Sequence, residues 1–333
     1  MENNEALFNR ILIVTTGLML ILVLIAMLTV GAGRGSGEQD PTTSALPAIA
    51  TTEATTTPAS GLRTGAYISV PDSATAIFDT ERLDAGYALL VNLGTGRDVA
   101  SYNADARIYP ASMTKVMTLL VACEAIDDVS VAVHVNASVL AAAYEAGASC
   151  AGFFAGERVT VLDLLYGAAL PSGADATGTL AVYVAGSEAA FVRRMNEKAA
   201  ELGLTRTHFV NSSGLHDADH YTTPREMAAI MACAMDNELC RTLLAARTYT
   251  TSVTDEHPEG LTLYSTAFSR MVTTEFGAAR LIAAKTGYTD EARFCLVSYA
   301  ETATGRYVLV TAGGTDRYAP VYDCKYVYGE FAE

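Results

Sequence analysis

The stretch LIAAKTGYTDEARFCLVSYAETATGRYVLVTAGG, residues 281–314, indicates the fold more clearly than any other part of the chain. Its segments Arg293–Ala300 and Arg306–Gly314 are rich in β-branched and aromatic residues, which is typical of strands. The short polar segment Glu301–Gly305 joins them. We therefore predict a β-hairpin here, with the residues just before it opening a further strand region.

A second strand pair is predicted far away in the sequence. The segment GYALLVNLGTGRDVASYN begins at Gly86 and alternates around Gly94-Thr95-Gly96, a combination that predicts two strands joined by a tight turn. The two strand regions are thus separated by about half of the chain. What lies between them has helical patterning.

Two helices in this middle part have recognisable ends. Ser187 is predicted to start one that stops at Gly203, where a C-terminal cap belongs. Thr223-Pro224-Arg225-Glu226 has the form of a capping box that opens a second helix. Strands at both ends with helices between them predict an α+β fold, a sheet into which a helical lobe is inserted.

The N-terminal part differs in composition from the rest. A short tail, residues 1–10, precedes residues 11–32, which contain no charged residue. As a helix, this run would span about 33 Å, close to the thickness of a bilayer's hydrocarbon core. We predict a membrane anchor. The alternative is a secretory signal peptide, because Val30 and Ala32 fit a small-residue cleavage pattern.

Residues 33–62 are dominated by Gly, Ser, Thr, Ala and Pro. Such a segment has too little apolar surface to offset the entropy of ordering it, so it is predicted to be a linker. The folded domain is then residues 63–333. A stalk between membrane and domain favours a single-pass membrane protein with an extracytoplasmic domain, or a secreted protein if the segment is cleaved.

Charge and metal-ligand spacing exclude some functions. The formal charge of −15 disfavours nucleic acid as a partner, since binding phosphates requires clustered Lys and Arg. His216 and His220 are four residues apart, but Asp217, Asp219 and Gly214 indicate a loop in place of a helix. We predict no metal and no organic cofactor. The six cysteines lie in apolar surroundings without a CxxC pair, which favours free thiols.

The strongest chemical signal is Tyr109-Pro110-Ala111-Ser112-Met113-Thr114-Lys115. Pro110 favours a helix that starts just after it, and residues three apart on a helix share a face. Lys115 can therefore reach the Ser112 hydroxyl. A serine becomes a nucleophile when a base takes its proton, and a lysine can be that base when burial and nearby cations lower its pKa.

Two further motifs follow in order. Leu170-Pro171-Ser172-Gly173-Ala174 is a polar kink between two helical runs, and Lys285-Thr286-Gly287 stands at the start of a strand region. Lys285 supplies a cation for an anionic substrate terminus, and glycine leaves room for a substrate strand. Each motif alone is weak evidence. The ordered set is strong, because penicillin-binding proteins and class A β-lactamases carry such a triplet.

With these motifs, the chain resembles the low-molecular-mass D-alanyl-D-alanine carboxypeptidases, serine peptidases that trim peptidoglycan stem peptides. The similarity runs over roughly residues 64–320 and includes YPASMTKVMTLL, LLYGAALPSGADA and AAKTGYTDEARF. It implies the DD-peptidase/β-lactamase-like fold, an antiparallel sheet flanked by helices. It also implies a stem peptide ending in D-Ala-D-Ala as substrate and β-lactams as covalent inhibitors.

The resemblance implies roles for individual residues. Ser112 is the nucleophile, Lys115 is its base, and Ser172 relays protons to the leaving amine. Lys285 and Thr286, with Gly287 beside them, hold the terminal carboxylate. The backbone N–H groups of Ser112 and Tyr288 form the oxyanion hole.

One position departs from the family pattern. Family members usually have an asparagine two residues after the second-motif serine, and this chain has Ala174. An amide there would contact both the lysine and the substrate, and each lost contact is worth about 1–3 kcal/mol. We predict that activity is retained, with Asp175, a water or a neighbouring amide taking part of that role.

Three alternatives share this machinery. A β-lactamase needs an additional glutamate for the deacylating water, and no E-x-x-x-N element lies between Ala174 and Lys285. A DD-endopeptidase uses the same acylation chemistry on cross-linked peptides. The third is a weakly active wall-binding or sensor protein, for which Ala174 is the only support.

Overall fold

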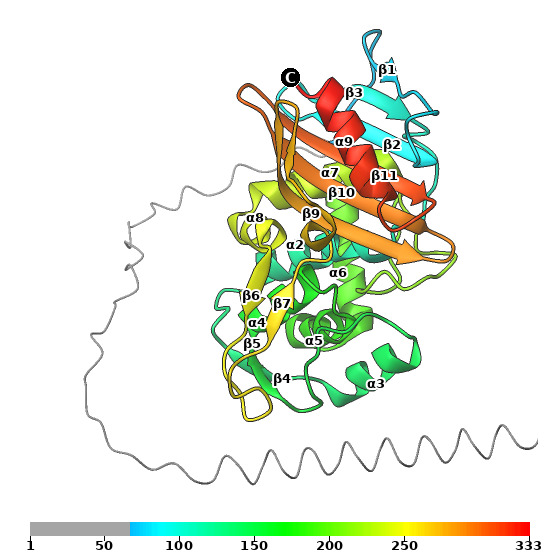
Figure 1. Ribbon diagram of the computed structural model, residues 1–333. Helices are drawn as coiled ribbons and strands as arrows, with labels where there is room; N and C mark the ends of the chain where they lie inside the picture. Colours follow the sequence, from blue (N-terminus) through cyan, green and yellow to red (C-terminus); the bar gives the residue numbers. More distant parts are fainter. Residues whose placement is uncertain (1–66) are drawn as a thin grey trace, which may run out of the picture. The chain divides into compact units, whose positions relative to one another are not determined.

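A seven-stranded sheet forms the centre of residues 67–333, the part of the chain that the computed structural model describes. Its strands follow the order β1-β3-β2-β11-β10-β9-β8 (Figure 1). All neighbours pair antiparallel except β1 with β3. The bounds are β1 Ala76–Ile77, β2 Tyr87–Asn92, β3 Arg97–Tyr102, β8 Glu275–Phe276, β9 Ala279–Thr289, β10 Arg293–Glu301 and β11 Arg306–Gly314.

Both predicted hairpins are confirmed. β10 pairs antiparallel with β11, with Val297 opposite Val310, and β2 pairs with β3 around the Gly94–Gly96 turn. The two hairpins join into one open sheet because β11 also pairs with β2. The two ends of the described chain therefore lie side by side, and everything between them is an insertion. The predicted α+β architecture is confirmed.

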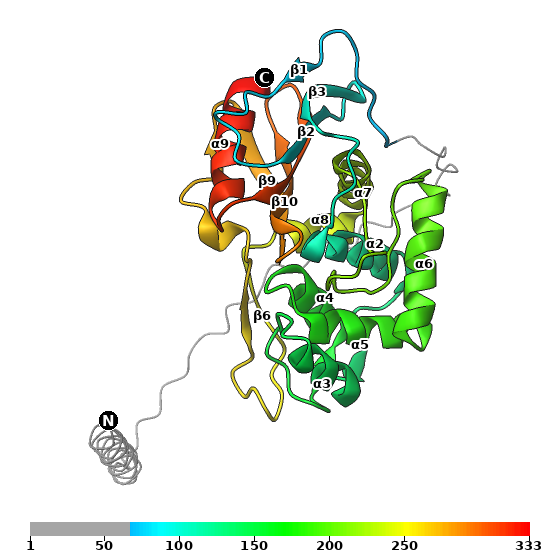
Figure 2. The ribbon, with the colours of Figure 1, turned by 90° about the vertical axis from the view of Figure 1, so that its right-hand side faces the viewer.

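Helices cover both faces of the sheet (Figures 1 and 2). Helix α9, Ala319–Phe331, lies on one face, and α7, Pro224–Asp236, packs on the other face with α2, Lys115–Ala125, and α8, Glu238–Ala245, beside it. The strands alternate accordingly. Leu89 of β2 is in the core under α7, whereas its neighbour Leu90 is in the core under α9.

The inserted lobe is mostly helical. It is built from the 3₁₀ turn η1 and helices α3 to α6 (Figure 2). It adjoins the sheet through η1, which contacts β9 and β10, and α2 packs against α7. Two small two-stranded sheets, β4–β5 and β6–β7, were not predicted. The bounds are η1 Ala111–Thr114, β4 Ala132–His134, α3 Ala137–Glu145, β5 Arg158–Thr160, α4 Val161–Ala169, α5 Ala174–Ala185, α6 Glu188–Glu201, β6 Thr248–Thr250, β7 Thr262–Tyr264 and the 3₁₀ turn η2 Phe268–Arg270.

The predicted helix starts are found, with one difference. Ser187 caps α6 and Thr223 caps α7, with Pro224 in the first turn. The capping box at α7 is only half formed. The Thr223 hydroxyl accepts from the N–H of Glu226, but the Glu226 carboxylate accepts from the N–H of Arg206 in place of the N-cap N–H. Glu226 therefore ties α7 to the segment that follows α6.

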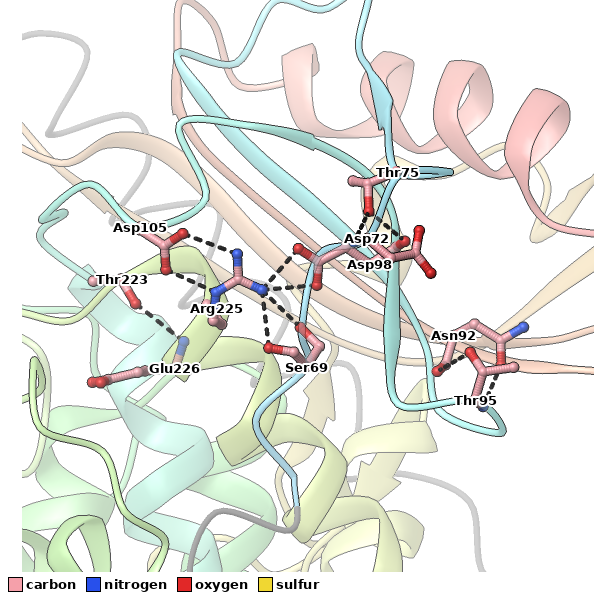
Figure 3. Close-up of polar contacts among 10 residues, drawn as sticks. All are labelled: Ser69, Asp72, Thr75, Asn92, Thr95, Asp98, Asp105, Thr223, Arg225 and Glu226. Carbon is pink, nitrogen blue, oxygen red and sulfur yellow. Dashed lines mark hydrogen bonds and ion pairs between the residues drawn. The ribbon is translucent and has the colours of Figure 1, made fainter.

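Arg225 joins α7 to the sheet (Figure 3). Its guanidinium donates to both carboxylate oxygens of Asp98 on β3, each at 2.8 Å, and to Asp105 at 2.7 and 2.9 Å. It also donates to the Ser69 backbone oxygen and hydroxyl. One side chain thus holds three separate segments together. Both acids keep this arginine charged, because the two carboxylates raise its pKa.

Within residues 67–333, no helix is both long and apolar enough to cross a membrane. The predicted tail, anchor and linker, residues 1–10, 11–32 and 33–62, lie outside the described residues. All six cysteines are free thiols. Four of them are buried, whereas Cys123 and Cys150 are partly exposed.

Candidate active site

Ser112 lies on a tight turn that leads directly into a helix. It is in η1, and α2 begins at Lys115. Ala111, just before it, has φ +46°, an unfavourable value for a residue with a Cβ. Gly214 packs against this turn so closely that a Cβ on it would lie 1.9 Å from the carbonyl oxygen of Ala111. The loop around Gly214 therefore supports the turn that presents Ser112.

Lys115 reaches the serine from one turn further along. Its Nζ donates to Ser112 Oγ at 3.0 Å and to the carbonyl oxygen of Ser213 at 2.6 Å. Only 2% of its surface is exposed. Burial lowers the pKa of Lys115 from 10.5 to about 7, against the opposing pull of Asp175 and Cys150. An amine with such a pKa is substantially unprotonated at neutral pH, as a general base must be.

The second and third motifs meet at a second buried lysine. Lys285 Nζ donates to Ser172 Oγ at 2.9 Å and to the carbonyl oxygen of Thr286 at 3.0 Å. Ser172 lies in the kink between α4 and α5 and has φ +68°. Burial first, then Lys115 and Arg270, hold the pKa of Lys285 well below its usual value. The two lysines thus lie near enough to influence each other.

Gly287 lines the cavity and also packs against the turn that carries Ser112. A Cβ on it would lie 2.8 Å from the carbonyl oxygen of Pro110 and 3.1 Å from the backbone nitrogen of Ser112. The room that glycine leaves is therefore taken by the turn that carries the serine. Beyond Leu281, the outer edge of β9 pairs with no other strand of the described chain, so this edge can receive an extended peptide.

A cavity of about 580 Å³ opens over these residues. It lies between β9, the kink at Ser172 and the loops at residues 146–149 and 213–216. Lys285 is only 1% exposed and reaches the cavity through the hydroxyl of Ser172. Among the predicted residues, the cavity is lined by Ser112, Lys115, Ser172, Thr286, Gly287 and Tyr288.

Two contributors to the site were not predicted. Arg270, at the end of η2, lines the cavity and lies close enough to Lys285 to lower the pKa of that lysine. Burial together with Arg317 lowers the pKa of Arg270 itself. The carbonyl oxygen of Ser213 holds Lys115 in place. Asn211-Ser212-Ser213-Gly214 could have suggested a turn, but nothing in the sequence links it to Lys115.

Ala174 occupies the position where family members usually have an asparagine. It lines the cavity and offers no polar side-chain atom. Asp175 does not fill the gap by hydrogen bonding, because its carboxylate accepts from the N–H of Ala151 at 2.8 and 3.0 Å. It acts on Lys115 only through its charge.

The two histidines that are four residues apart have different surroundings. His216 lines the cavity, whereas His220 is buried with Nε2 2.7 Å from Thr114 Oγ1.

This arrangement agrees with what similarity to known proteins indicates. A family model described as D-alanyl-D-alanine carboxypeptidase matches residues 73–315. The chain belongs to this family. The match covers most of the described residues and includes all of the motif residues above.

Individual relatives extend this finding. D-alanyl-D-alanine carboxypeptidase DacF of Bacillus subtilis is 33% identical over 232 residues, which are 70% of this chain but only 58% of DacF. A D-alanyl-D-alanine carboxypeptidase of a Streptomyces species is 35% identical over 235 residues, 68% of this chain and 78% of the relative. Against DacF, the chain thus covers less than two thirds of the relative's length.

Solved structures share the fold. The crystal structure of a Streptomyces DD-transpeptidase aligns with a TM-score of 0.66 at 29% identity, covering 74% of this chain and 97% of that one. A penicillin-binding protein homolog from Mycobacterium tuberculosis aligns with a TM-score of 0.65 at 26% identity, covering 79% and 97%.

Proposed function

We propose that this protein is a serine-type D-alanyl-D-alanine carboxypeptidase, which removes the terminal D-alanine from peptidoglycan stem peptides through an acyl-enzyme on Ser112. The observation that carries the proposal is the contact between Lys115 Nζ and Ser112 Oγ, at 3.0 Å, in a buried site where the lysine pKa is lowered to about 7. The names of the curated relatives support the choice of substrate.

The acylation step follows from the geometry. Lys115 takes the proton of Ser112 as the oxygen attacks the carbonyl between the two D-alanines. The backbone N–H groups of Ser112 and Tyr288 stabilise the oxyanion. The C–N bond then breaks, and D-alanine leaves with a proton delivered through Ser172, whose hydroxyl accepts from Lys285. Water hydrolyses the ester and restores Ser112.

The substrate terminus is held by a positive end of the cavity. Thr286 and Arg270 line it there, and Lys285 lies directly behind Ser172. A carboxylate bound by a guanidinium and a hydroxyl fits this set. Arg270 thus takes the direct contact that the sequence assigned to Lys285, whose amine donates to the Ser172 hydroxyl instead.

The test is release of D-alanine from a pentapeptide ending in D-Ala-D-Ala. Wild-type protein should release it, and Ser112→Ala should reduce the rate by at least a thousandfold. A Ser269→Ala variant is a matched control, because Ser269 lies outside the lining of the cavity among the described residues. Equal rates for wild type and Ser112→Ala would overturn the proposal.

The same machinery should react with β-lactams, which imitate the substrate terminus. Intact-mass analysis with benzylpenicillin should show one adduct on the wild type and none on Ser112→Ala. Absence of any wild-type adduct would favour a wall-binding or sensor protein. Steady hydrolysis of nitrocefin, in place of a stoichiometric burst, would favour a β-lactamase.

We also propose that residues 11–32 anchor the protein in the cell membrane as a single pass, with the catalytic domain outside the cytoplasm. The support is the uncharged apolar run in the sequence. Membranes from expressing cells can be washed with alkaline carbonate and then extracted with detergent. An anchored protein should be released only by detergent, whereas a cleaved one should appear in the medium with a shortened mass.

A further inference from the structure

The cavity is lined by two carboxylates, Asp290 and Glu291, which follow the end of β9. Its permanent cation, Arg270, ends η2 and lies close enough to Lys285 to lower the pKa of that lysine. Thr286 and Asp290 are four residues apart along an extended chain, about 13 Å at 3.3 Å per residue. The cleft is therefore electrically polarised along β9, although the whole chain is acidic at −15.

The proposed function fixes how a substrate lies along this axis. With the terminal carboxylate at Thr286 and Arg270 and the scissile carbonyl at Ser112, the rest of the peptide must run along the free edge of β9 toward Tyr288 and Asp290. The residue preceding D-Ala-D-Ala then lies opposite the end of the strand. A side chain of four or five bonds can reach the carboxylates from there.

The groups around these carboxylates leave them able to accept a cation. Tyr288 Oη donates to Asp290 Oδ1 at 2.8 Å, which leaves Oδ2 for a ligand. His216 Nδ1, on the opposite wall, lies 3.5 Å from Glu291 Oε2. Arg293 is on the same turn and exposed. Glu291 is 44% exposed at its side chain, so an incoming ammonium is only partly desolvated.

Resting on the proposed function, we infer that Asp290 and Glu291 recognise the free side-chain amine of a diamino acid that precedes D-Ala-D-Ala. In a cross-linked stem peptide, this amine is an uncharged amide. The cleft therefore selects stem peptides that are not cross-linked through that amine.

A substrate series on the wild-type protein tests this without any mutation. Nα-acetyl-L-lysyl-D-alanyl-D-alanine carries the free ε-amine, its ε-acetylated analogue is neutral, and its ε-succinylated analogue is negative. We expect kcat/KM to fall in that order, by about two- to fivefold per step, as for partly exposed ion pairs. The ratio should shrink in 0.5 M salt, where screening is strong. Equal kcat/KM for all three peptides would overturn the inference.

The double variant Asp290→Asn/Glu291→Gln should bring the three rates together. Its matched control is Asp255→Asn/Glu256→Gln, which changes another exposed Asp-Glu pair, on the loop between β6 and β7. The control should keep the full preference. A preference that persists in the first variant would overturn the assignment to these residues. Failure of the proposed function looks different, because no D-alanine would then be released from any peptide.

Discussion

Arg225 and Lys115 are both basic side chains removed from water, yet the protein treats them in opposite ways. Arg225 has an 11% exposed side chain and is surrounded by Asp98 and Asp105 (Figure 3). Lys115 is 2% exposed and contacts a hydroxyl and a carbonyl oxygen, both uncharged. The carboxylates raise the pKa of the arginine, and burial lowers that of the lysine to about 7.

This difference in charge state matches the role of each basic side chain. A charge paired with carboxylates is fixed, so Arg225 can hold α7, β3 and Ser69 together at any physiological pH. A buried amine without a carboxylate contact is poised to lose its proton, so Lys115 can take one from Ser112. The low pKa of this proposed base thus depends on the absence of a carboxylate contact as much as on its contacts with Ser112 and Ser213.

Giving the catalytic position a permanent charge should cause the largest change. Lys115→Arg places a permanent cation at this position and removes the base, because a guanidinium does not deprotonate in proteins. We expect acylation by benzylpenicillin to fall by at least a thousandfold, near the upper range of general-base catalysis. Stopped-flow or mass measurement of the acylation rate checks this. Acylation within tenfold of the wild type would show that another group is the base.

Removing the paired cation should affect stability in place of catalysis. Arg225→Met leaves Asp98, whose side chain is 0% exposed, without its partner. We expect the free energy of unfolding to fall by about 3–5 kcal/mol, measured by urea denaturation. The acylation rate well below the melting temperature should be unchanged.

The control for this variant is Arg97→Met. Arg97 pairs with Asp72 on the surface, where the side chains are 53% and 28% exposed. Its loss should change the free energy of unfolding by less than about 1 kcal/mol. If the two variants were equally destabilised, burial would not be the reason that the Arg225 network matters.

The contact between Ser112 and Lys115 could be predicted from the sequence, because it depends on local spacing. Ser112 and Lys115 are three residues apart, so a helical turn alone brings them together. The contact between Lys285 and Ser172 joins residues 113 positions apart. No periodicity gives such a contact, and only the ordered motifs and their family resemblance indicated it.

The parts that were missed have physical reasons. Strands β4 to β7 have three residues each, too few for an alternating pattern to stand out. Helix α9 has no clean apolar stripe, since Tyr328 is fully buried while Tyr322 is 62% exposed. Arg270 was missed because its place near Lys285 follows from the path of the chain into β9, which no local pattern indicates.

A smaller effect is expected from pH alone. The unprotonated fraction of Lys115 increases with pH up to about 7 and then levels off. Below that pH, the acylation rate should fall about tenfold per unit. The same shift has a sign for stability: between about 7 and 10.5, the unfolded chain binds more protons at this residue, so stability should rise with pH there. A pH-independent acylation rate between 5 and 7 would contradict this.

Placing a carboxylate beside the catalytic lysine makes it resemble Arg225. Ala174 lines the same cavity as Lys115, so Ala174→Asp introduces an acid there. The added charge should raise the pKa of Lys115 and move the midpoint of the pH–rate profile upward by about one unit or more.

The matched variant Ala174→Asn has the same shape without the charge, and it restores the amide that relatives usually carry. It should leave the midpoint in place while raising the acylation rate by about ten- to hundredfold, because each regained contact is worth about 1–3 kcal/mol. Identical midpoints for the Asp and Asn variants would mean that the pKa of Lys115 does not depend on the absence of a nearby carboxylate.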